Sequence, residues 1–204
     1  MRSTDPNGLY EWDSKCKSGD DVCEENRTKF RDAYAKVVEA FSKAKEGTEE
    51  YDTLKGIIDK VGTEGDGNNV RVAFSSTQSD PGVTVPTVGG KIKMTFNFSL
   101  YEKPLLKAGW GTDDISFSLA GLVAHEGRHA TEGVGAGVKW VFSRKQRLDF
   151  ERRALGAESL LYKTVNKLEP FGPLWNPSWK AAESDGARRD AVEKMLQDLY
   201  GKKK

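Results

Sequence analysis

The chain contains only two histidines, and they lie four residues apart in the run His125-Glu126-Gly127-Arg128-His129. Positions i and i+4 of an α-helix lie one turn apart on the same face, so two neutral imidazoles at this spacing can bind one metal ion. The glutamate next to the first histidine would lie beside the metal, where it can take a proton from a water molecule that the metal activates. The pattern H-E-x-x-H therefore predicts a zinc site with His125 and His129 as ligands and Glu126 as the catalytic base.

The residues around this motif predict that it lies near the end of a largely buried helix. Ile115, Leu119, Leu122 and Val123 repeat at helical spacing, and Gly133 follows soon after the second histidine. Buried polar groups need partners, and a metal ion would satisfy all three polar side chains of the motif. The alternative is a pair of ordinary histidines on a helix surface, beside an ion pair between glutamate and arginine.

A third ligand is expected from a second helix. A catalytic zinc site usually has three protein ligands and an open fourth position, and because no third histidine exists, the ligand should be Glu, Asp or Cys. Read as a helix, residues 147–165 place Glu151 and Glu158 on one apolar stripe, where an unpaired charge is costly. One glutamate can bind the metal while the other hydrogen-bonds a metal-bound histidine. Either glutamate could instead pair with Arg128, Arg144 or Arg152.

The motif followed by Glu151-x-x-Ala154 on a second helix resembles the glutamate-zincin metallopeptidases. In that family the glutamate of E-x-x-A is the third zinc ligand, which implies Glu151 here and leaves Glu158 as the alternative ligand or as the partner of a histidine. The resemblance covers residues 113–163 and implies a zincin-like fold. The oxyanion formed in such a reaction also needs a hydrogen-bond donor besides the metal. Tyr162, on the same stripe, is a candidate for this donor, and an ordinary core tyrosine is the alternative.

Two segments ahead of the motif predict β-strands. Residues 91–100 alternate apolar and polar side chains, and Val70, Val72 and Phe74 predict a partner strand. In the family that the motif resembles, an edge strand near the site binds extended peptides, and residues 91–100 would take that place or form a core strand. Residues 75–90, rich in Pro, Gly, Ser and Thr, predict a loop. The expected fold is α+β, with a small, mainly antiparallel sheet packed on a zinc-bearing helix pair.

Length, composition and charge favour one domain without a membrane span. The 204 residues are 37% hydrophobic and 31% charged, which suits a single globular domain. Lys and Arg number 32 against 31 Asp and Glu, and this balance gives no reason to expect nucleic acid as a partner. No apolar run is long enough to span a membrane or to form a secretory signal after Met1. Cys16 and Cys23 are the only cysteines, and a disulfide and free thiols both remain open.

A second resemblance comes from the segment Asp5-Pro6-Asn7-Gly8-Leu9, which is typical of a turn. It resembles the D-P-x-G-L boundary of Rhs-repeat polymorphic toxins, in which the core protein cleaves itself after the leucine and a variable toxin domain follows. The resemblance implies cleavage between Leu9 and Tyr10, with residues 1–9 as the end of the core and residues 10–204 as one toxin domain. It also implies a secreted effector that is delivered without its own signal peptide, and a cognate immunity protein in the producing cell.

Together these patterns predict a zinc-dependent metallopeptidase that cleaves a protein or peptide of a target cell. His125, His129 and Glu151 would bind Zn²⁺, and Glu126 would act as the base. Three alternatives stay open. One is a zinc amidase or peptidase that acts on peptidoglycan. Another is a binding module whose metal is purely structural. The last is a helical domain that contains the pattern but binds no metal.

Overall fold

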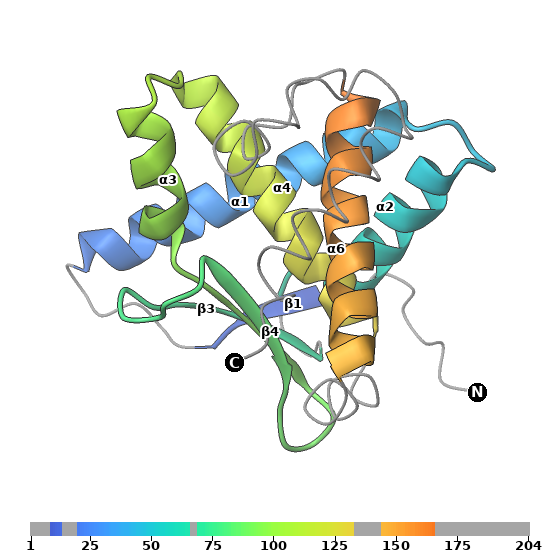
Figure 1. The fold of residues 1–204 in the computed structure, drawn as a ribbon. Helices are drawn as coiled ribbons and strands as arrows, with labels where there is room; N and C mark the ends of the chain where they lie inside the picture. Colours follow the sequence, from blue (N-terminus) through green and yellow to red (C-terminus); the bar gives the residue numbers. More distant parts are fainter. Residues whose placement is uncertain (1–8, 14–19, 66–68, 133–143, 166–204) are drawn as a thin grey trace.

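The computed structural model describes residues 9–13, 20–65, 69–132 and 144–165. This part of the chain has an α+β fold, with five helices and a five-stranded mixed sheet. The helices are α1 (Asp21–Lys43), α2 (Glu49–Val61), α3 (Phe98–Lys107), α4 (Thr112–Thr131) and α6 (Arg144–Thr164). The strands are β1 (Leu9–Trp12), β2 (Thr63–Glu64), β3 (Val70–Phe74), β4 (Gly82–Pro86) and β5 (Ile92–Phe96). In Figure 1 the helices gather above the sheet.

The sheet is mixed, with the strand order β2-β1-β3-β5-β4. Strand β1 runs parallel to β2 and β3, and β3 runs parallel to β5. Only the pairing of β4 with β5 is antiparallel. The expectation of a mainly antiparallel sheet is therefore wrong. The reason is that α1 and α2 lie between β1 and β2, and a helical crossover of this kind returns the chain in the same direction.

The strand predicted at residues 91–100 is β5, but it ends at Phe96. Its predicted partner is confirmed as β3, with Val70 opposite Ile92 and Phe74 opposite Phe96. Phe98 begins α3 instead of continuing the strand. The apolar alternation runs past the strand because Phe98 is itself buried, with its ring stacked on Phe96 at a centroid separation of 5.3 Å. Because β5 lies between β3 and β4, it is a core strand and not an edge strand.

Residues 75–90, expected as a loop, contain strand β4. Val83 and Val85 of β4 lie opposite Thr95 and Lys93 of β5. The turn between the two strands includes Gly89 and Gly90, which have φ angles of 84° and 76°, a conformation that favours glycine. Proline at the end of β4 suits an edge strand, because it cannot donate a hydrogen bond to a further strand. Among the described strands, β4 forms one edge of the sheet.

Helix α4 is the centre of the helical layer, and it packs against α1, α2, α6 and β4. Its middle is buried on all sides, and the fully enclosed positions include Ala120, Val123 and Ala124. The inner face of the sheet and α1 add an aromatic cluster in which the ring of Phe30 lies 5.2 Å from Tyr10 and 5.5 Å from Phe96. A helix buried in this way is expected to be apolar all round, so polar side chains on it need specific partners.

Two glycines allow other helices to approach α4 closely. A Cβ atom on Gly121 would lie 2.3 Å from Oη of Tyr162 on α6, and one on Gly127 would lie 2.6 Å from Cγ2 of Ile57 on α2. Carbon atoms in contact need about 3.5–4.0 Å, so no side chain fits at either position. The two helices with the predicted metal ligands, α4 and α6, therefore pack closely because residue 121 has no side chain.

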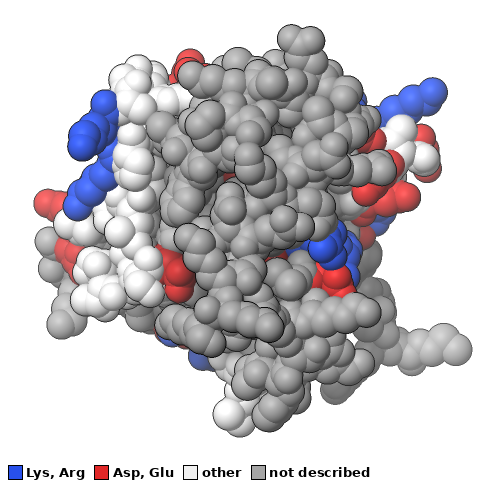
Figure 2. All heavy atoms as spheres, viewed as in Figure 1, with Lys and Arg blue, Asp and Glu red and all other residues white. Residues whose placement is uncertain are grey.

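Several further expectations concern the surface and the cysteines. Of the helices that the structure describes, none combines the length and apolar character needed to cross a membrane. Charged side chains of both signs are visible on the described surface of the face in Figure 2, in line with the net charge of +1. Cys23, in the first turn of α1, is disulfide-bonded, which favours the disulfide over free thiols. Cys16 lies outside the described residues.

The close packing of α4 on α6 predicts opposite effects for two glycine-to-alanine substitutions. Gly121→Ala should destabilise the protein by about 1–3 kcal/mol, because the new methyl group overlaps Tyr162. Gly156→Ala, on α6, meets no atom within 4 Å and should instead stabilise the protein by about 0.5–1 kcal/mol through helix propensity. Urea unfolding of both variants measures the difference. Equal effects of the two substitutions would contradict the close approach at residue 121.

Candidate metal centre

The two histidines lie on the face of α4 that meets α6, near the C-terminal end of α4. Their ring centroids are 5.0 Å apart, as expected for i and i+4 positions on one helix face. Their side chains are 14% and 10% exposed. The helix that contains the motif is largely buried, as predicted, and the two histidines are partly buried.

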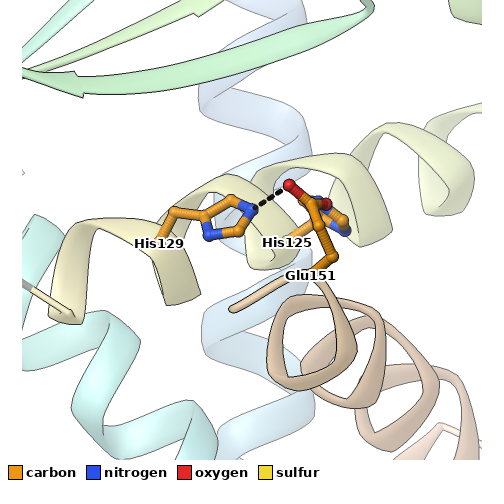
Figure 3. A group of neighbouring side chains, drawn as sticks. All are labelled: His125, His129 and Glu151. Carbon is orange, nitrogen blue, oxygen red and sulfur yellow. Dashed lines mark ion pairs between the residues drawn. The ribbon is translucent and has the colours of Figure 1, made fainter. Parts of the chain in front are cut away.

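Glu151 extends from α6 towards both imidazoles (Figure 3). Its Oε2 atom lies 3.5 Å from Nε2 of His125, and its Oε1 atom lies 3.7 Å from Nε2 of His129. The structure describes other contacts for two of the three arginines considered as alternative partners. Arg128 contacts Glu132, and Arg152 donates a hydrogen bond to Asp149.

The donor atoms of His125, His129 and Glu151 fit one divalent metal ion. One atom from each of the three residues lies within 4.8 Å of the others. Around a tetrahedral ion with bonds of about 2.0–2.2 Å, neighbouring ligand atoms lie about 3.4 Å apart. The separations of 3.5 and 3.7 Å involve different oxygens of Glu151, and the set of one donor atom from each residue would have to contract from within 4.8 Å to reach this value. These three residues are therefore close enough to bind a metal ion.

The electrostatic environment of these three residues also favours a bound cation. Burial opposes ionisation of Glu151, but its contacts with His125 and His129 outweigh burial and hold its pKa well below the ordinary value. Burial likewise acts to lower the pKa of His125, but contacts with Glu151 and Glu158 and the charge of Glu126 raise this pKa to about 10. The surroundings thus favour positive charge beside ionised Glu151. A divalent cation supplies such charge and competes with the proton for the imidazole.

Glu158 approaches His125 from the other side of the imidazole ring. Its Oε2 atom lies 3.6 Å from Nδ1 of His125, and its Oε1 atom accepts a hydrogen bond of 3.0 Å from Oη of Tyr101 on α3. Metal-binding histidines usually donate their second nitrogen to a carboxylate or a carbonyl group, which fixes the ring and its tautomer. The geometry therefore favours Glu151 as the ligand and Glu158 as the group that orients His125. The sequence did not indicate Tyr101.

The ion pair between Arg153 and Glu132 fixes the two helices next to these ligands. Nε and Nη2 of Arg153 donate to the two carboxylate oxygens of Glu132 at 2.7 and 2.9 Å. Glu132 is the C-cap of α4, three residues after His129, and Arg153 is two residues after Glu151. A paired, two-pronged contact of this type fixes orientation as well as distance, so it sets the end of α4 against α6 where the ligands meet.

Glu126 points away from α6, towards strand β4. It is 3% exposed, and its Oε2 atom accepts a hydrogen bond of 2.7 Å from Oγ1 of Thr84. Thr84 lay in the segment expected as a loop, so the sequence analysis missed it. The alternation of Val83 and Val85 was the available signal, but the surrounding glycines and prolines obscured it.

The remaining predicted site residues lie outside this group. Tyr162 is 1% exposed, and its hydroxyl group lies against Gly121, as expected for a core tyrosine. Leu9 and Tyr10 form the start of β1, where they pair with Thr63 and Glu64 of β2. Residues 1–8 lie outside the described residues. Cleavage between Leu9 and Tyr10 and a catalytic role for Tyr162 stay predictions.

The separate roles of the two glutamates on α6 can be tested by zinc titration. Glu151→Gln should cause the larger loss of affinity, because it removes a charged ligand. Glu158→Gln should weaken binding by roughly 10- to 100-fold, the usual effect of losing a group that orients a ligand. Asp149→Asn is the matched control on the same helix, since Asp149 contacts Arg152, and it should leave the affinity unchanged. A larger effect at Glu158 than at Glu151 would reverse the assignment.

Comparison with known proteins gives no relative from which a role could be transferred. No protein-family model, no curated protein and no solved structure matches the chain. The function must therefore be inferred from the chemistry of the residues that the fold brings together.

Proposed function

We propose that this protein is a zinc-dependent metallopeptidase. The observation that carries the proposal is the convergence of His125, His129 and Glu151, whose donor atoms lie within 4.8 Å of one another. Two histidines and one carboxylate form a ligand set of catalytic zinc sites, which leave one coordination position for water or substrate. When bound, zinc supplies a Lewis acid that polarises a carbonyl group and makes water more acidic.

In this proposal Glu126 transfers the proton. It follows His125 directly in the sequence and is not one of the three ligand residues, and its charge acts on His125 while its carboxylate contacts Thr84 of β4. Its carboxylate takes a proton from the attacking water as the oxygen bonds to the scissile carbonyl carbon. It then gives this proton to the nitrogen of the leaving amine as the C–N bond breaks.

The position of β4 supports an extended polypeptide as the substrate. Strand β4 packs against α4 and, among the described strands, forms an edge of the sheet next to Glu126. An edge strand presents backbone N–H and C=O groups to which an extended peptide can add as a further strand. We therefore propose that β4, and not residues 91–100, is the strand that binds the extended peptide. Glu126 contacts the inner face of this strand through Thr84.

We further propose that the protein acts as a delivered effector toxin and has a cognate immunity protein. This proposal rests on the resemblance of Asp5-Pro6-Asn7-Gly8-Leu9 to the boundary motif of Rhs-repeat toxins. Leu9 and Tyr10, on either side of the implied cleavage point, both belong to β1.

Glu126→Gln is the direct test of the proposed chemistry. The amide cannot accept a proton as the carboxylate does, so the variant should bind zinc as the unmodified protein does but lose more than about 100-fold in kcat. The measurements are zinc content by mass spectrometry and cleavage of a mixed library of quenched-fluorescence peptides. His125→Ala is the companion variant and should lose both zinc and activity.

Two outcomes would contradict the proposal. Full activity of Glu126→Gln would show that another group transfers the proton. Zinc-loaded protein that cleaves no peptide would exclude the peptidase, and peptidoglycan fragments assayed in parallel would then show whether the substrate is a cell-wall amide.

A further inference from the structure

The side chain of Glu126 is enclosed by two residues of β4 that no sequence motif indicated. Oγ1 of Thr84 lies 2.7 Å from Oε2 of Glu126 and 3.1 Å from its backbone oxygen. A threonine hydroxyl group has a single proton to donate. Both partners are acceptors, and the shorter contact is to the carboxylate. The hydrogen bond therefore joins β4 to the predicted catalytic base.

Gly82 provides the space that the carboxylate occupies. A Cβ atom on Gly82 would lie 2.6 Å from Oε1 of Glu126, 2.7 Å from Cγ and 2.9 Å from Cδ. Gly82 and Thr84 lie opposite Phe96 and Met94, two buried residues of β5, so both face α4 from the inner side of the sheet. One residue of β4 thus binds the carboxylate, while the other makes room for it.

We propose that Thr84 and Gly82 are positioning residues for Glu126. The Thr84 hydroxyl group holds Oε2, and the missing side chain at Gly82 leaves room for Oε1 and the rest of the Glu126 side chain against the strand. A glutamate side chain has several rotatable bonds, and holding a catalytic group in one geometry contributes directly to rate. This inference rests on the proposed function, because positioning matters for catalysis only if Glu126 is the base.

A purely structural role for the hydroxyl group gives a different expectation. A buried carboxylate without a hydrogen bond is costly, so Thr84 would then affect stability and leave turnover unchanged. A positioning role instead affects kcat while substrate binding and zinc content stay the same. The two roles are therefore separated by kinetic constants measured on folded, zinc-loaded protein.

The experiment uses Thr84→Val, which keeps the shape of the side chain and removes the hydroxyl group. We expect kcat to fall at least tenfold, with KM and zinc content within about twofold of the unmodified protein. Thr84→Ser keeps the hydroxyl group and should restore kcat to within about threefold. Thr95→Val is the matched control, because Thr95 lies on the neighbouring strand β5 between two buried residues and points to the opposite face.

Gly82→Ala tests the second half of the inference without removing any hydrogen-bonding group. Its methyl group would displace the Glu126 carboxylate, so kcat should fall at least tenfold at unchanged zinc content. Circular dichroism and zinc content show whether each variant is folded. Full kcat in folded, zinc-loaded Thr84→Val, or an equal loss in Thr95→Val, would overturn the inference.

A stability measurement separates failure of this inference from failure of the proposed function. The change in urea midpoint caused by Thr84→Val is measured in two zinc-free backgrounds, the unmodified protein and the Glu126→Ala variant. If the hydrogen bond is present, Thr84→Val should lower the urea midpoint only in the background that retains Glu126. This expectation holds whether or not the protein is a peptidase. Equal shifts in both backgrounds would refute the contact itself. A coupled pair in a protein that cleaves no peptide would refute the proposed function and, with it, the role of Thr84 in positioning a catalytic base.

Discussion

The site depends on the burial of one carboxylate between two imidazoles. Glu151 is 8% exposed, and an ionised group at such a position is stable only with close opposite charge or with a metal ion. The close packing at Gly121, together with the ion pair between Arg153 and Glu132, sets α6 at the distance at which Glu151 reaches both histidines. The chemistry of the centre is therefore a consequence of how α4 and α6 pack.

The sequence was sufficient for the residues on these two helices. The i, i+4 histidines define one helix face, and the apolar stripe of the second helix contains Glu151 and Glu158, so the periodicity placed each pair on one face of its own helix. The need for a third zinc ligand and the resemblance to the glutamate zincins supplied the expectation that the two faces meet. The resemblance already implied Glu151 as the ligand, and the geometry favours the same choice. Glu151 faces Nε2 of both imidazoles, whereas Glu158 faces Nδ1 of His125.

The sheet was predicted less well, for physical reasons. The direction of a strand pairing depends on the connection between strands, and short alternating segments do not encode it. Strand β4 has only five residues, with glycine at one end and proline at the other, so its local composition is that of a loop. It becomes a strand because β5 supplies hydrogen-bonding partners along its length. Thr84 acquires its contact with Glu126 only through this pairing, and for that reason no local pattern identified it.

Helix geometry explains why one short motif involves two different neighbours. Successive residues of an α-helix are about 100° apart around the axis, so His125 and Glu126 point in different directions from α4. His125 faces α6, which contributes the carboxylates, whereas Glu126 faces β4, which contributes a hydroxyl group and an open position at Gly82. A reaction that uses both residues would therefore involve the side of α4 that faces α6 and the side that faces β4. The proposed pairing of an extended polypeptide with the edge of β4 would bring the substrate to the strand that contacts Glu126.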